Sequence, residues 1–300
     1  MPDQISDQTK GFDVVDVQVT DTESELFQQL FHAYNTGKLE LPTMPEVAMK
    51  IIKLADDPHA KLTEIAKIIQ LEPAVAGSMM KAANSPLYLG SKPVHNIKNA
   101  VVRLGLKTTR NLATSIALRD KFQVKSQHIK QRMQDLWEHS VNISTLCYAI
   151  ARKHRNFDPE RALMAGLMHD IGTIPILNYV DKKKIDLSPD ELETTIAKLR
   201  MMVGGLVIDY WGLNSELATV VEEAEEWYRD SSPEADYCDI VVVAQLYEAQ
   251  QLSNADAFPA LEEIPAYHKL ALGGLDEAKQ LQIIKDAEEE ISTIKQVLNG

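Results

Sequence analysis

The chain has 300 residues, of which 45% are hydrophobic and 25% charged, and its formal net charge at pH 7 is −13. This length and apolar content can bury a sizeable core, as one large or two small domains. The two cysteines, Cys147 and Cys238, give no disulfide framework, and the polar N-terminus and the interrupted apolar runs exclude a signal peptide and a membrane span. We therefore expect a cytoplasmic protein with no membrane partner.

Apolar periodicity and capping residues predict helices throughout the chain, and no strong strand pair is predicted. Residues 1–20 are expected to be disordered or a short strand. Gly105 and the pair Gly204–Gly205 are each expected to end a helix. The predicted helices cover 21–37, 47–55, 63–71, 73–83, 96–104, 108–122, 127–155, 158–170, 188–204, 214–227, 237–251 and 276–297. The expected fold class is therefore all-α.

The charge is distributed unevenly along the chain. From Glu216 onward there are 19 acidic and 5 basic residues, whereas 81–132 contains 11 Lys or Arg residues and the single acidic residue Asp120. Solvated helix faces of different sign are the simplest interpretation. Alternatively, the basic segment is a surface for an anionic partner or for the acidic end of the same chain. The acidic overall charge argues against nucleic acid as that partner.

Several short motifs follow one another in an order that is informative. They include Leu-Pro-x-x-Pro at 41–45, Ala-Ala-Asn-Ser-Pro-Leu-Tyr at 82–88, Arg-Leu-Gly at 103–105, Trp-Glu-His-Ser at 137–140 and His-Asp-Ile-Gly at 169–172. Together they resemble the HDOD domain, the HD-related output domain of bacterial signalling proteins, over about residues 38–230. The resemblance implies a multi-helical HDOD/HD-like bundle with a regulatory role in bacterial signal transduction.

The same resemblance divides the chain into parts. We expect an N-terminal leader and first helix at 1–37, an HDOD domain at 38–237 and an acidic helical C-terminal extension at 238–300. The HDOD domain would consist of an N-terminal helical subdomain, 38–125, and an HD-like subdomain, 126–237. No receiver, kinase or diguanylate cyclase motif accompanies it in the sequence, so we expect a stand-alone module.

His139, His169 and Asp170 are the candidate metal ligands. A neutral imidazole nitrogen and a neighbouring carboxylate oxygen can share one divalent ion. The resemblance to the HD phosphohydrolase superfamily implies these three ligands and a fourth, an Asp on a downstream helix. That position falls at Gln245, and Asp239 lies about 9 Å away along the helix axis at 1.5 Å per residue. We therefore expect an incomplete HD-type site that holds no metal, and one divalent ion (Mn, Fe, Mg or Zn) on three ligands is the alternative.

The binuclear members of the superfamily, which cleave cyclic dinucleotides, use additional histidines. No His occurs between residues 170 and 267, and Arg200, Ala224 and Glu225 occupy the positions where these histidines would be expected. Without a metal, His169 would bond the last free carbonyls of its helix, and a hydrogen-bonded His–Asp pair would join two helices.

Two functions follow from these observations. The first is a non-catalytic regulatory module that binds a partner protein or a small signal and that is compatible with a homo-oligomer. The second is a metal-dependent phosphohydrolase of the HD type with a reduced ligand set. The missing carboxylate favours the first, so we assign no catalytic residue and expect no cofactor.

Overall fold

The computed structural model describes residues 25–299 except 56, 58, 60, 89, 91, 125, 187, 251–256 and 271–287. Every regular element within these residues is a helix, which confirms the all-α prediction. None of the described helices is both long and apolar enough to cross a membrane. The leader expected at 1–20 and the helix starts expected at Asp21 and Asp276 lie outside the described residues.

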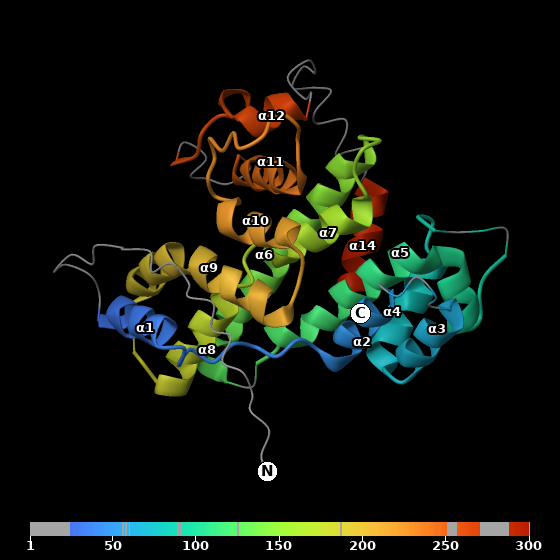
Figure 1. Ribbon diagram of the computed structural model, residues 1–300, viewed down its shortest axis with the longest axis horizontal. Helices are drawn as coiled ribbons and strands as arrows, with labels where there is room; N and C mark the ends of the chain where they lie inside the picture. Colours follow the sequence, from blue (N-terminus) through green and yellow to red (C-terminus); the bar gives the residue numbers. More distant parts are fainter. Residues whose placement is uncertain are drawn as a thin grey trace, which may run out of the picture.

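The first group of helices lies at one end of the molecule (Figure 1). It consists of α2 (Glu46–Ala55), α3 (Leu62–Gln70), α4 (Pro73–Asn84) and α5 (Ile97–Leu118), and α5 contacts the other three. Gly105 interrupts α5 with φ 78° and ψ 172°, a conformation that L residues rarely adopt. The sequence prediction of a break at this glycine is therefore confirmed.

Two central helices connect this group to the rest of the chain (Figure 1). They are α6 (Gln127–Arg152) and α7 (Pro159–Met168), which pack against each other along their lengths. The Asp158 carboxylate caps α7 by accepting hydrogen bonds from the backbone N–H groups of Glu160 and Arg161. All residues of α7 from the second turn onward are buried, so the C-terminal end of α7 is held firmly in the core.

The next helices are α8 (Thr173–Lys183), which the sequence pattern did not predict, α9 (Pro189–Trp211) and α10 (Ser215–Glu223). The expectation that Gly204–Gly205 ends a helix is wrong, because α9 continues to Trp211. A Cβ at Gly204 would lie 2.1 Å from Val221 Cγ1 of α10. The absence of a side chain at these glycines therefore allows α9 and α10 to pack closely against each other.

The remaining helices pack around these groups. They are α1 (Glu25–Asn35) on α9, α11 (Tyr237–Ala249) on α6, α7 and α10, α12 (Pro265–Lys269) on α11, and α14 (Glu288–Asn299), with the short 3₁₀ helices η1 (Arg119–Phe122) and η3 (Leu261–Glu263). α14 returns to pack against α4, α5 and α6. It does so through buried Ile294, Val297 and Leu298, and Trp137 Nε1 of α6 donates a hydrogen bond to Asn299 Oδ1 at 2.8 Å.

Candidate metal centre

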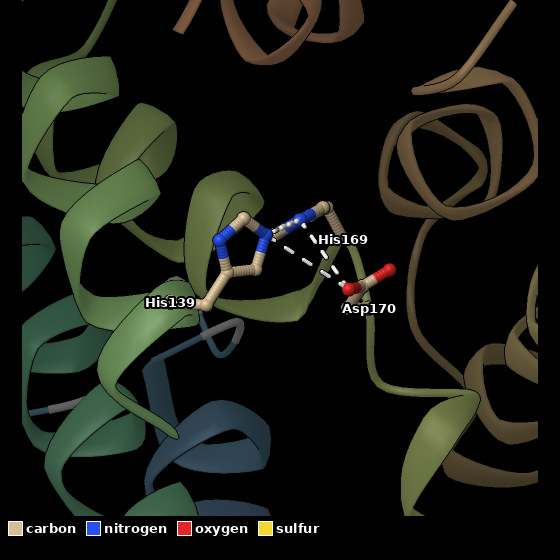
Figure 2. A group of neighbouring side chains, drawn as sticks. All are labelled: His139, His169 and Asp170. Carbon is tan, nitrogen blue, oxygen red and sulfur yellow. Dashed lines mark hydrogen bonds and ion pairs between the residues drawn. The ribbon is translucent and has the colours of Figure 1, made fainter. Parts of the chain in front are cut away.

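The structure brings the three predicted ligands together. His139 lies midway along α6, and His169 and Asp170 form the turn that directly follows α7. One ligand atom from each residue lies within 4.8 Å of the other two. Figure 2 shows a nitrogen of each ring and one carboxylate oxygen of Asp170 facing a common point. The close packing of α6 on α7 produces this arrangement.

The second nitrogen of each ring has its own oxygen partner. His169 Nδ1 lies 2.7 Å from the carbonyl oxygen of Gly166, which can only accept, so Nδ1 carries a proton. His139 Nδ1 lies 2.8 Å from Glu248 Oε2 and donates to this carboxylate. In both rings Nε2 is thus the atom left to face the partner side chains, and the two Nε2 atoms are 3.2 Å apart. This is the arrangement found for metal-ligating histidines and their outer partners.

The charges of the cluster follow from burial and from these contacts. Burial lowers the pKa of His169 to about 4, so this ring is neutral at pH 7. Burial also lowers the pKa of His139, but the hydrogen bond to Glu248 and the charge of Asp170 outweigh it and raise this pKa above its ordinary value. Burial raises the pKa of Asp170, but the neighbouring positive charges, including Arg200, outweigh it and keep the carboxyl ionised.

The two oxygens of Asp170 face different groups. Oδ2 lies 3.9 Å from His139 Nε2 and 3.8 Å from His169 Nε2. Oδ1 lies 3.6 Å from Arg200 Nε of α9, and the same guanidinium forms an ion pair with Glu225. A guanidinium therefore stands beside the oxygen that would have to bridge to a second metal ion. The sequence suggested a hydrogen-bonded His–Asp pair. Both distances from Asp170 Oδ2 to the imidazole Nε2 atoms exceed hydrogen-bond range, and the two histidines contact each other instead.

The fourth ligand expected in the superfamily is engaged elsewhere. Gln245, on α11, donates from Nε2 to the carbonyl oxygen of Ala224 at 2.7 Å. Asp239 is completely buried, and its carboxylate pairs with Arg229 at 2.6 Å and with Lys269 at 3.7 Å. Neither side chain supplies a carboxylate to the cluster. The α11 residue that does reach it is Glu248, and it contacts the outer nitrogen of His139.

Glu248 is a member of the site that the sequence motifs did not indicate. Glu248 lies three residues after Gln245, so both residues share one face of α11, and helical spacing alone would have pointed to it. Arg200 and Glu225 were placed where additional histidines would be expected, and the structure does bring them to the cluster, as an ion pair. The three inner residues fit one divalent ion with open coordination positions, which leaves the fourth to a water or another ligand.

Comparisons with known proteins agree with this fold. The model of the HDOD domain family matches residues 41–227. A crystal structure named "Putative metal-dependent phosphohydrolase" from Shewanella amazonensis SB2B is 24% identical, with a TM-score of 0.74 over 91% of this chain and 98% of that one. A "Putative signal transduction protein" from Marinobacter aquaeolei VT8 is 21% identical, with a TM-score of 0.62 over 92% of this chain and 66% of that one.

One curated relative also matches. An uncharacterized protein of Treponema pallidum (strain Nichols) is 24% identical over 162 residues, which is 52% of this chain. The match covers only 30% of the length of that relative.

Proposed function

Because the chain belongs to the HDOD domain family, we propose that it is a non-catalytic signalling module that binds a protein partner or a small signal. The observation that carries the proposal is the contact between Arg200 and Asp170. A hydrolytic metal needs its carboxylate ligand free of competing cations and needs room for a substrate oxygen. Here a guanidinium, itself paired with Glu225, lies 3.6 Å from one oxygen of the only carboxylate among the three inner residues.

The position of Gln245 supports the same proposal. Its side-chain amide is bound to the backbone of Ala224, which closes the end of α10, so this residue joins two helices. An amide oxygen is also a weaker ligand for a dication than a carboxylate. On this proposal the His139–His169 contact connects α6 to the end of α7 and contributes to the stability of the module.

A second candidate function is a phosphohydrolase with one metal ion. It is favoured by the orientation of the two imidazoles, whose Nε2 atoms face Asp170 while each Nδ1 has an oxygen partner. His139, His169 and Asp170 would hold the ion, which would polarise a phosphoryl oxygen or lower the pKa of a water molecule. Glu248 would hold the His139 ring in its orientation.

Metal analysis combined with an activity screen separates the two functions. Protein purified without chelator would be analysed by mass spectrometry and assayed with p-nitrophenyl phosphate and bis-p-nitrophenyl phosphate. The control is the double variant His169→Ala/Asp170→Ala. We expect no hydrolysis above that of the control. The proposal would be overturned, and the hydrolase established, if the wild-type protein held stoichiometric metal and hydrolysed a probe while the control variant did neither.

A further inference from the structure

A pocket separate from the metal centre lies between α1 and α8, at the end of the molecule away from α3 and α4 (Figure 1). Its volume is about 350 Å³, which lies in the size range of small-molecule sites. Its walls come from α1, from residues 38–40 and from α8, and both helices pack against α9. The pocket is therefore a gap between two helices that α9 holds near each other. None of the metal-centre residues lines it.

Three exposed lysines give this pocket its charge. They are Lys38, which follows α1, and Lys182 and Lys183 of the last turn of α8. Glu40 is the only acidic side chain in the walls, and it forms an ion pair with Lys182. Within the described part of the chain, Lys38 and Lys183 have no acidic partner. Three positive charges against one negative charge, with the imidazole of His32 counted as neutral, leave a net charge of +2 in the walls.

Both α1 and α8 end beside the pocket, and a helix C-terminus carries about half a negative elementary charge. Backbone donors already occupy part of these two ends. The Lys38 N–H donates to the carbonyl oxygen of Ala33 at 2.8 Å, after Gly37 has turned the chain with φ 63°. Lys184, with φ 52°, closes α8 by donating to the carbonyl oxygen of Asp181 at 3.1 Å. The excess of two lysine charges therefore outweighs the partial charges of the two helix ends.

The rest of the walls is partly apolar and includes Ala33, Leu39, Pro175 and the ring of Tyr179. Lys183 Nζ lies 5.8 Å from the centroid of that ring, so a cation and an aromatic surface are next to each other. A ligand that fills the pocket would therefore combine an anionic group with an organic body.

Phosphate is the anionic group that suits these lysines best. An ammonium group is a compact point charge and a common ligand of phosphate. A phosphate monoester carries a charge of about −1.5 to −2 at pH 7, which matches the charge of the pocket, whereas a carboxylate carries a single negative charge. Glu40 disfavours an anion of higher charge. We propose that the pocket between α1 and α8 binds a small phosphate monoester with an aromatic or apolar body, through Lys38, Lys182 and Lys183.

Such a ligand would join α1 to α8 directly. α8 begins with Thr173, three residues after Asp170, so the ligand would contact the helix that leads away from the metal centre. That the ligand acts as a signal rests on the function proposed above, but its binding does not.

Isothermal titration calorimetry of the full chain, stripped of metal on a chelating resin, tests the site at low ionic strength. The probes are phenyl phosphate, benzoate with its single negative charge, uncharged phenol, and inorganic phosphate, which has no organic body. The variants are Lys38→Gln and Lys183→Gln, and the control is Lys153→Gln, which changes an exposed lysine at the end of α6 outside the pocket. His169→Ala/Asp170→Ala separates this pocket from the metal centre. The three lysines are exposed, so their variants should fold, and circular dichroism verifies this.

We expect phenyl phosphate to bind at one site and more tightly than the other three probes, and each pocket variant to weaken this binding about fivefold or more. Lys153→Gln and the metal-centre variant should bind as the wild type does. The proposal is overturned if phenyl phosphate does not saturate at about 10 mM, if another probe binds as tightly, or if Lys153→Gln has the same effect as the pocket variants. It is also overturned if the pocket variants keep the wild-type affinity or if the metal-centre variant abolishes binding. None of these results changes the hydrolysis assay, so the two proposals fail separately.

Discussion

His139 Nε2 and His169 Nε2 lie 3.2 Å apart although the other nitrogen of each ring already donates to an oxygen. Two neutral rings in this orientation would point two lone pairs at each other. A positive charge therefore has to lie between them, either as a proton shared by the two nitrogens or as a metal ion. This His–His geometry is compatible with a structural contact and with a metal site. The residues around the two rings determine which of the two is favoured.

Glu248→Gln is expected to weaken metal binding. The amide keeps the size and an acceptor for His139 Nδ1, but it removes the negative charge that makes the ring a better ligand. Loss of an outer partner of this kind reduces metal affinity by about 10- to 100-fold. The measurement is calorimetric titration with Zn²⁺, and exposed Glu226→Gln is the control. Equal affinities of Glu248→Gln and wild type would show that Glu248 does not act through His139.

Arg200→Met is expected to have the opposite effect. It removes a cation from beside Asp170 Oδ1 and leaves the Glu225 carboxylate without its partner. Less repulsion and more negative charge should raise the affinity for Zn²⁺ by about tenfold or more. Arg155→Met at the surface is the control in the same titration. A weaker or unchanged affinity would mean that the guanidinium does not compete with a metal ion.

Local signals in the sequence predicted the helices well, and tertiary contacts explain the failures. The helices predicted to start at 158 and at 188 both begin with a capping residue, and a cap depends only on the next few residues. Asp158 and Ser188 accept hydrogen bonds from backbone N–H groups of the first turn. Gly204 was misread because its role is set by Val221, which lies on another helix. The three inner residues of the metal centre were found from the motif resemblance. Glu248 was not predicted, because the motif resemblance points to Gln245 and because Glu248 meets His139 only through the packing of α11 on α6.

Gly204→Ala is expected to destabilise the protein, because its new methyl group would overlap with Val221 Cγ1. Overpacking of this kind costs about 1–3 kcal/mol. Urea denaturation of the single variants and of Gly204→Ala/Val221→Ala should show that the double variant is more stable than the sum of the two single changes predicts. Additive changes would mean that the two residues do not contact each other.

Gly77→Ala provides the matched control for the previous experiment. Gly77 lies in α4, is exposed, and a Cβ there would meet no atom within 4 Å. Alanine at this position should stabilise the protein by about 0.5–1 kcal/mol, since it lowers the conformational entropy of the unfolded chain. A loss of stability there would mean that glycine-to-alanine changes harm these helices for reasons other than the helix contact.

Arg229→Met is expected to be the most damaging single change outside the metal centre. Arg229 is 7% exposed and donates to Asp239 at 2.6 Å, to Asp236 at 2.9 Å and to Glu223 at 3.0 Å. Without it, the completely buried Asp239 keeps the backbone N–H of Asp236, at 3.0 Å, and among the described residues the charge of Lys269, at 3.7 Å. Removing one partner of a buried ion pair costs about 3–5 kcal/mol, because the other charge stays in the core.

Urea denaturation measures this loss, and Arg229→Met/Asp239→Asn shows its origin. If the uncompensated charge of Asp239 is the cause, the double variant should recover part of the free energy of unfolding, because the amide can remain buried without a counter-ion. If the double variant is as unstable as the sum of the two single variants, Arg229 acts instead by holding the segment between α10 and α11. In that case Asp236, which both caps α11 and pairs with Arg229, would be the residue through which the effect is transmitted.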